Sequence, residues 1–131
     1  MNLETFSFDI DADGIAHAIF DVPGRSMNTL TGKAIADIIA ITKEVAENDK
    51  ITGLVISSGK PSGFCAGADL GEMNESAGGG KPETEMSEAE LKAKQFERGF
   101  ALNKTLRELE TCGKPVAVAL NGLALGGGLE V

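Results

Sequence analysis

The amino-acid sequence predicts an α/β fold in which helices cover a largely parallel sheet. Three observations support this: a hairpin pattern at the N-terminus, two later apolar segments of strand length, and a segment of helical periodicity before each of those two. The chain has 131 residues, of which 42% are hydrophobic. That is enough for one domain with its own core.

The first elements form an antiparallel hairpin. Residues 5–11 alternate polar and apolar side chains, as in a half-buried strand, and residues 11–14 supply a turn that contains glycine. Residues 15–22 form the second strand of the hairpin. We expect residues 25–30 to be a loop, with Thr31 as the N-cap of the helix that follows.

Two helices and an intervening strand come next. Apolar residues recur at helical spacing over 32–48, while 51–57 is a short apolar run of the kind buried in a parallel sheet. Ser87 and Glu90 form a capping-box pattern. They predict a long helix that runs to about Thr111.

Glycine and proline mark the remaining boundaries. Residues 59–70 form a loop rich in small side chains, and the acidic, Gly-rich segment 76–88 is expected to be mobile. Gly113 is predicted to cap the long helix at its C-terminus. Residues 115–120 then form a buried strand, and Asn121-Gly122 turns out of it.

Charge and composition exclude several function classes. The net charge is −8 and the chain has no Trp and no Tyr, so a nucleic-acid-binding surface is not expected. Arg25 and Lys60 are local cations that could still meet a phosphate. Two distant cysteines and one histidine exclude a Cys/His zinc site. With no signal peptide and no segment of membrane-spanning length, we expect a soluble, reduced, cytoplasmic protein.

Two loops are the candidates for chemistry. Residues 64–69 follow the strand 51–57, and residues 125–130 follow the strand 115–120. If the two strands are neighbours in a parallel sheet, both loops emerge at the same edge, where ligands of such sheets bind. Small residues leave backbone N–H groups accessible, and two such donors can stabilise an oxyanion. Glu130 adds a carboxylate for acid/base chemistry.

Each of these features also has an ordinary structural interpretation. Three glycines after a strand, Gly126 to Gly128, most often form a turn. Cys65 and Cys112 are more simply packed side chains than nucleophiles, and His17 is a solvent-facing or hydrogen-bonded strand residue. Glu130 would complement a helix dipole. P-loop and Gly-x-Gly-x-x-Gly spacings are absent.

The two loops together resemble a known family. Phe-Cys-Ala-Gly-Ala-Asp-Leu at 64–70, with Lys-Pro-Val-Ala at 114–117 and Asn-Gly-Leu-Ala-Leu-Gly-Gly-Gly-Leu-Glu at 121–130, resembles the crotonase (enoyl-CoA hydratase/isomerase) superfamily. Residues 23–30, residues 106–115 and the long insert are similar to the hydratase module that opens a bacterial multifunctional fatty-acid-oxidation α subunit. The resemblance implies a crotonase-like ββα spiral, of which residues 1–131 are the N-terminal part.

The resemblance also implies roles for individual residues. The amides of Ala68 and Gly127 would form an oxyanion hole for an acyl-CoA thioester, and Glu130 would be the first of two catalytic glutamates. The CoA moiety would be bound by the loop residues Ser26, Met27, Asn28, Ala66, Gly67, Asp69 and Leu70. No metal and no cofactor are implied, because coenzyme A is part of the substrate. NAD would enter only with a following dehydrogenase domain.

The function implied is reversible hydration of a trans-2-enoyl-CoA to a 3-hydroxyacyl-CoA in fatty-acid β-oxidation. There are two alternatives. One is double-bond isomerisation, and the other is a fragment that binds acyl-CoA or serves in assembly without turnover. In the family the second glutamate and the trimer-forming helices lie further along, so we expect an N-terminal fragment that is inactive alone. The implied partners are an acyl-CoA and either a trimer-type assembly or a complex with a thiolase subunit.

Overall fold

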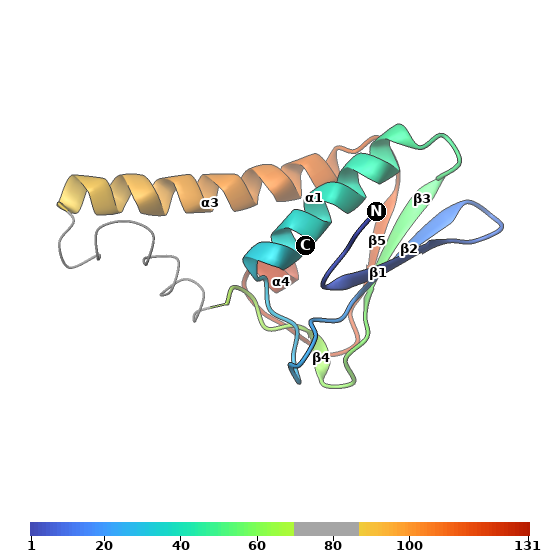
Figure 1. Cartoon of the computed structure of the whole chain (residues 1–131), viewed down its shortest axis with the longest axis horizontal. Coiled ribbons are helices and arrows are strands. Elements are labelled where there is room, and N and C mark those ends of the chain that lie inside the picture. Colours follow the sequence, from blue (N-terminus) through green and yellow to red (C-terminus); the bar gives the residue numbers. More distant parts are fainter. Residues whose placement is uncertain (70–86) are drawn as a thin grey trace.

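The structure, a computed structural model, describes residues 1–69 and 87–131, without the side chains of residues 94, 95, 98 and 99. Strands and helices alternate along most of this chain (Figure 1). The elements are β1 (Phe6–Ile10), β2 (Ile15–Phe20), α1 (Gly32–Glu47), β3 (Gly53–Ser58), β4 (Gly63–Cys65), α3 (Glu88–Glu110), β5 (Val116–Ala119), β6 (Leu123–Ala124) and α4 (Gly127–Glu130).

The main sheet has the predicted mixed character. Its strand order is β1-β2-β3-β5, with β1 antiparallel to β2 and the other two pairs parallel. The hairpin turn is held by Asp11, whose carboxylate accepts hydrogen bonds from the backbone N–H groups of Asp13 and Ile15, both at 2.9 Å. Because β3 and β5 are parallel neighbours, the loops that follow them start from the same edge of the sheet.

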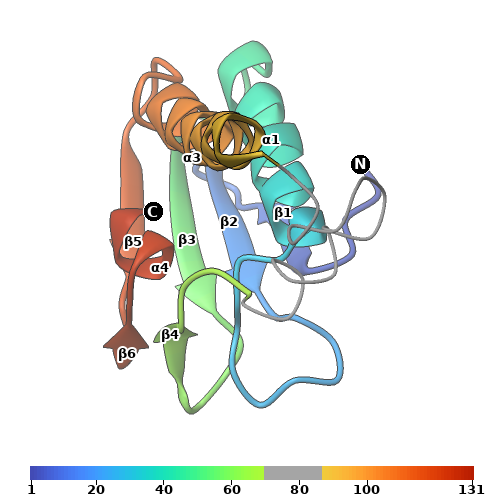
Figure 2. The ribbon, with the colours of Figure 1, turned by 90° about the vertical axis from the view of Figure 1, so that its left-hand side faces the viewer.

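Helices α1 and α3 lie on the same face of the sheet (Figures 1 and 2). The Thr31 hydroxyl accepts a hydrogen bond from the Ala34 amide at 3.1 Å, which confirms the predicted N-cap. The inward side chains of α1 join the core between the helices and the sheet; those that are buried and apolar are Ala34, Ile38, Ile41 and Val45. The amphipathic pattern of α1 therefore places its apolar face as expected.

Helix α3 begins where its capping box predicts. The Ser87 hydroxyl accepts from the Glu90 amide, and the Glu90 carboxylate accepts from the Ser87 amide. The predicted C-cap is wrong: Thr111 takes that position, and Gly113 follows with a φ of 86°. The N-terminal half of α3 extends beyond the sheet (Figure 1). Phe96 and Phe100 of this helix are exposed, with ring centroids 6.1 Å apart.

Two predictions about strands need correction. The segment 115–120 is not a buried strand: Ala117 and Ala119 of β5 are exposed, because they point away from the helices. The segment 59–70 is not entirely a loop, since β4 pairs in parallel with β6 in a separate two-stranded sheet. Figure 2 shows this small sheet at one end of the main sheet.

The remaining structural expectations fall partly outside the described residues. Of the segment 76–88, only Ser87 and Glu88 are described, and they cap and begin α3. Within the described part of the chain, no helix combines the length and the apolar character that crossing a membrane requires.

Candidate active site

The two candidate loops lie against each other. Strands β4 and β6 pair at the start of both loops, and the Leu125 amide then donates to the Cys65 carbonyl at 3.0 Å. A Cβ on Gly67 would lie only 2.8 Å from the Leu125 carbonyl oxygen, and the φ of Gly67 is 92°. A side chain at this position would separate the loops and strain the backbone, so glycine is required for their contact.

The backbone N–H of Ala68 points away from Leu30, the residue that holds the Ala68 loop. Ala68 forms a parallel β-bridge with Leu30, and the two hydrogen bonds of this bridge involve the residues on either side of Ala68. The Leu30 amide donates to the Gly67 carbonyl at 2.8 Å, and the Asp69 amide donates to the Leu30 carbonyl at 3.3 Å. Successive N–H groups of an extended segment point to opposite sides. The Ala68 N–H therefore faces away from Leu30, and no described residue accepts a hydrogen bond from it.

Gly127 offers the second amide. Gly126, with a φ of 50°, turns the chain into α4, and its carbonyl accepts from the amides of Leu129 and Glu130 at 2.9 and 3.2 Å. The Gly127 amide is at the first position of this helical turn, where an N–H group has no partner within the helix. Among the described residues none accepts a hydrogen bond from it.

Glu130 lies one turn after Gly127 and is exposed. It lines a hollow of about 570 Å³ between α3 and β5, together with Leu106, Glu110, Val116 and others. Neither Ala68 nor Gly127 lines this hollow. The structure thus brings the two candidate loops together, and Glu130, one turn after Gly127, lines the hollow between α3 and β5. Glu110 in that hollow is paired with Arg107 at 2.6 Å.

The candidate CoA-binding loop is closely tied to the donor loop. The Ala66 amide donates to the Asn28 carbonyl at 2.8 Å, and the Ser62 hydroxyl donates to the Ser26 carbonyl. Ser26 is exposed and Met27 is partly exposed, so both are accessible to a ligand. Asn28 is not accessible: its side chain is fully buried and hydrogen-bonded to main-chain groups, a structural role that the sequence did not reveal.

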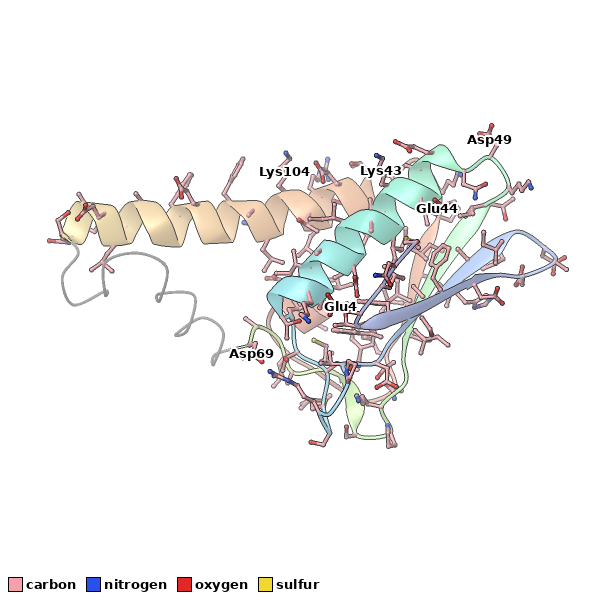
Figure 3. The ribbon with its side chains drawn as sticks, in the orientation of Figure 1. Glu4, Lys43, Glu44, Asp49, Asp69 and Lys104 are labelled. Carbon is pink, nitrogen blue, oxygen red and sulfur yellow. The ribbon has the colours of Figure 1, made fainter. Side chains whose placement is uncertain are left out.

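Asp69 links the end of the Ala68 loop to the loop that precedes α1. Its carboxylate, in a residue only 7% exposed, accepts hydrogen bonds from Arg25 Nη1 and, at 3.1 Å, from the Thr29 hydroxyl. Figure 3 places Asp69 on the side of the molecule where α1 begins. Leu70, the last residue of the predicted set, lies outside the described residues. Asp69 therefore contributes a link between loops, which the sequence did not predict.

Cys65 and His17, two other titratable residues, are held in packed or hydrogen-bonded positions. Cys65 is fully buried, and this burial raises the pKa of its thiol despite the nearby amides of Gly67 and Leu30. His17 is half-buried and its Nε2 lies 3.0 Å from Asp11, which lowers the pKa of that carboxyl group. Both observations confirm the structural interpretation of these two residues.

The two cations considered as phosphate ligands are also engaged. Lys60 pairs with the Asp21 carboxylate at 2.5 Å and donates to the Val22 carbonyl at 2.8 Å. Arg25 pairs with Asp69. In the described residues no group of three or more histidine, cysteine or acidic side chains is arranged to hold a metal ion.

Comparisons with known proteins agree with one another. The sequence model described as enoyl-CoA hydratase/isomerase matches residues 15–131. The chain is 40% identical over 130 residues to a fatty acid oxidation complex subunit alpha from Shewanella amazonensis, covering 98% of this chain and 16% of that protein.

Two crystal structures of enoyl-CoA hydratases resemble the fold. The one from Shewanella pealeana has a TM-score of 0.77 at 22% identity, and the alignment covers 97% of this chain and 43% of that one. The one from Bacillus anthracis has a TM-score of 0.71 at 24% identity, with 96% and 43% covered. The chain therefore spans less than half the length of these relatives.

Proposed function

Since the chain belongs to the enoyl-CoA hydratase/isomerase family, we propose that the whole protein reversibly hydrates a trans-2-enoyl-CoA to a 3-hydroxyacyl-CoA. The observation that carries this proposal is that the amides of Ala68 and Gly127, on two loops held in contact, have no acceptor among the described residues. A thioester carbonyl oxygen placed between them accepts both hydrogen bonds. This lowers the energy of the enolate that forms when water adds to the conjugated double bond.

The proposed reaction assigns one proton transfer to Glu130. Its carboxylate takes a proton from water as the water oxygen bonds to C3 of the substrate, and the electron pair of the double bond moves toward the thioester oxygen. A second acid, supplied by the rest of the whole protein, then protonates C2. In the structure Glu130 lines the hollow between α3 and β5, so the step requires its carboxylate to reach a water held beside the two amides.

The amide of Gly127 can be tested directly by substitution. Gly127 is the first residue of α4, a helix position where proline fits the backbone and removes the N–H donor, although proline, like alanine, brings a Cβ to within 2.6 Å of the Leu30 Cδ1. Gly127→Ala is the matched control because it adds a Cβ but keeps the N–H. We expect Gly127→Pro to lower kcat for crotonyl-CoA hydration by a further factor of about 10²–10³ relative to Gly127→Ala. Equal rates for the two variants would refute the role of this donor.

Glu130→Gln in the whole protein tests the proton-transfer role. We expect kcat for crotonyl-CoA hydration to fall by a factor of about 10²–10⁴, with little change in acetoacetyl-CoA affinity measured by calorimetry. Glu108→Gln is the control, because Glu108 is an exposed carboxylate on α3 that lies 3.7 Å from Lys104. Hydration that is unchanged by Glu130→Gln would overturn the assignment.

One observation favours a second candidate, acyl-CoA binding without turnover. Glu130 borders a recess that neither donor residue lines, so the loops could bind a thioester without a carboxylate beside it. Calorimetry with acetoacetyl-CoA and a hydration assay on the same sample separate the two candidates. Binding with turnover supports the hydratase, binding alone supports the second candidate, and formation of a 3-enoyl-CoA from a 2-enoyl-CoA would indicate isomerase activity.

The cofactor requirement, location and assembly of the whole protein are also proposals. We propose that the protein needs no cofactor beyond the CoA moiety of its substrate, and that it works in the cytoplasm. We also propose that it assembles as a trimer-type oligomer or with a thiolase subunit. Sedimentation analysis of the purified whole protein, alone and mixed with a thiolase, would test the assembly, and a purely monomeric protein in both samples would contradict it.

A further inference from the structure

Leu30 is the residue that touches both donor loops. It lies directly before Thr31, the N-cap of α1, and is only 5% exposed. Its amide donates to the Gly67 carbonyl at 2.8 Å, and its carbonyl accepts from the Asp69 amide at 3.3 Å. These two bonds hold the peptide groups on either side of Ala68, so the backbone of Leu30 fixes the orientation of the Ala68 amide.

The side chain of Leu30 reaches the other loop. A Cβ built on Gly127 would lie 2.6 Å from Leu30 Cδ1, which means that the leucine methyl already occupies the space beside the Gly127 backbone. Leu102 of α3 lies further away, with its Cδ2 at 3.6 Å from the same point. Among the described residues other than its chain neighbours, the atom nearest to this Cβ position is therefore a methyl carbon of Leu30.

Leu30 is itself held in place. Thr31 anchors it to α1 through its hydrogen bond to the Ala34 amide, and the neighbouring Thr29 hydroxyl donates to the Asp69 carboxylate. A residue fixed on both sides in the sequence moves little when a ligand binds. It can therefore act as a spacer between two groups that must keep a defined separation.

We propose that Leu30 is a positioning residue that sets the separation of the Ala68 and Gly127 amides. This inference rests on the proposed oxyanion function of those amides. Two donors that share one carbonyl oxygen must each lie about 2.7–3.1 Å from it, so a small displacement of either loop weakens the bond that stabilises the enolate. Leu30 acts on both donors at once, through its backbone on Ala68 and through its side chain on Gly127.

Leu30→Val in the whole protein is the first test. The substitution shortens the side chain that supports Gly127 but leaves the backbone bonds to the Ala68 loop. We expect kcat for crotonyl-CoA hydration to fall about tenfold, because displacements of this kind reach about 10²-fold at 1 Å. Acetoacetyl-CoA affinity should be nearly unchanged. Leu54→Val is the matched control, a leucine 2% exposed in β3, and it should leave kcat unchanged.

A spectroscopic measurement separates positioning from a general packing effect. Acetoacetyl-CoA that is isotope-labelled at its thioester carbonyl should show a lowered carbonyl stretching frequency when bound, because two donors weaken the C=O bond. Leu30→Val should reverse part of that shift, and Leu54→Val should not. An identical shift in Leu30→Val and the unaltered protein would overturn the inference. No shift in the unaltered protein would instead refute the proposed function itself.

Compensation between Leu30 and Gly127 gives an independent test. Gly127→Ala alone should lower kcat, since its Cβ meets the leucine methyl at 2.6 Å and pushes the loop away. In the double variant with Leu30→Val, the smaller side chain makes room for that Cβ. We expect the double variant to be more active than Gly127→Ala alone. Strictly multiplicative losses would show that the two positions are not coupled, and would refute the proposal.

Discussion

Asn28 provides the sharpest test of how the site is supported. The side chain is fully buried, and its Oδ1 accepts from the Val22 amide at 2.9 Å. Its Nδ2 lies 2.8 Å from the Phe20 carbonyl oxygen and 3.1 Å from both the Phe64 carbonyl oxygen and the Ser58 hydroxyl, so its two hydrogens are shared among three acceptors. One amide group thus connects the ends of β2 and β3 with β4, the strand that leads into the Ala68 loop.

The cost of Asn28→Ala follows from the groups that lose a partner. The Phe20 carbonyl keeps the Gly59 amide, and the Ser58 hydroxyl keeps the Gly63 carbonyl. The Val22 amide and the Phe64 carbonyl lose the bond that Asn28 makes to them. A buried polar group without a partner costs about 1–3 kcal/mol, so we expect the free energy of unfolding to fall by about 4 kcal/mol.

Denaturant unfolding followed by far-UV circular dichroism measures this loss, since the chain has no Trp or Tyr for fluorescence. Hydrogen exchange shows where the stability is lost, because exchange at the Val22 amide should become faster in Asn28→Ala. Asn2→Ala is the control, an exposed asparagine whose substitution should change stability by less than about 0.5 kcal/mol. A loss below about 1 kcal/mol in Asn28→Ala, with unchanged exchange at Val22, would refute the reasoning.

Three further outcomes are expected. Gly128→Ala should lower the free energy of unfolding by about 3 kcal/mol, because its Cβ would lie 2.6 Å from Cys65 Cβ and 2.7 Å from the Cys65 carbonyl oxygen. Thermal unfolding measures this loss, and an unchanged Tm would contradict the packing. Iodoacetamide at neutral pH should alkylate Cys112 before Cys65, whose thiol is buried and has a raised pKa, and peptide mass spectrometry showing equal rates would oppose this. The Ser87 amide and hydroxyl lower the pKa of Glu90. The capping box therefore stabilises α3 fully above the pKa that Glu90 has in the unfolded chain, and this stabilisation is lost as the pH falls through the pKa of Glu90 in the folded chain. The protection factors of amides at the start of α3, which correct measured exchange for its intrinsic pH dependence, should therefore fall as the pH drops below the unfolded-state pKa of glutamate. Glu90→Gln should weaken that dependence, because it removes the titrating carboxyl group but keeps the Ser87 amide; protection factors that ignore acidification would argue against the reasoning.

The elements that the sequence predicted well are those specified by neighbours in the chain. The hairpin turn depends on Asp11 and the residues just after it, and both helix starts depend on a cap and an amide three residues later. The two candidate loops are predicted for the same reason, since their glycines and small residues are adjacent in the sequence, and the donor role of their amides stays a prediction. Local chemistry is sufficient for such features.

The features that the sequence did not reveal depend on residues far apart in the chain. Strands β4 and β6 are too short for a periodic pattern, and they exist because each pairs with the other. The exposure of Ala117 and Ala119 in β5 depends on which face of the sheet the helices cover. An apolar run has the same appearance in the sequence whether one or both of its faces are covered.

The sequence by itself determined the family, the α/β class and the identity of the two loops that carry the candidate amides. Only the tertiary structure decided how these loops are supported. It buried Asn28 among main-chain groups instead of presenting it to a ligand, and it placed Leu30 between Ala68 and Gly127. The physical reason is that an oxyanion site depends on the separation of two amides, and that separation is set by packing between distant segments rather than by the residues beside each amide.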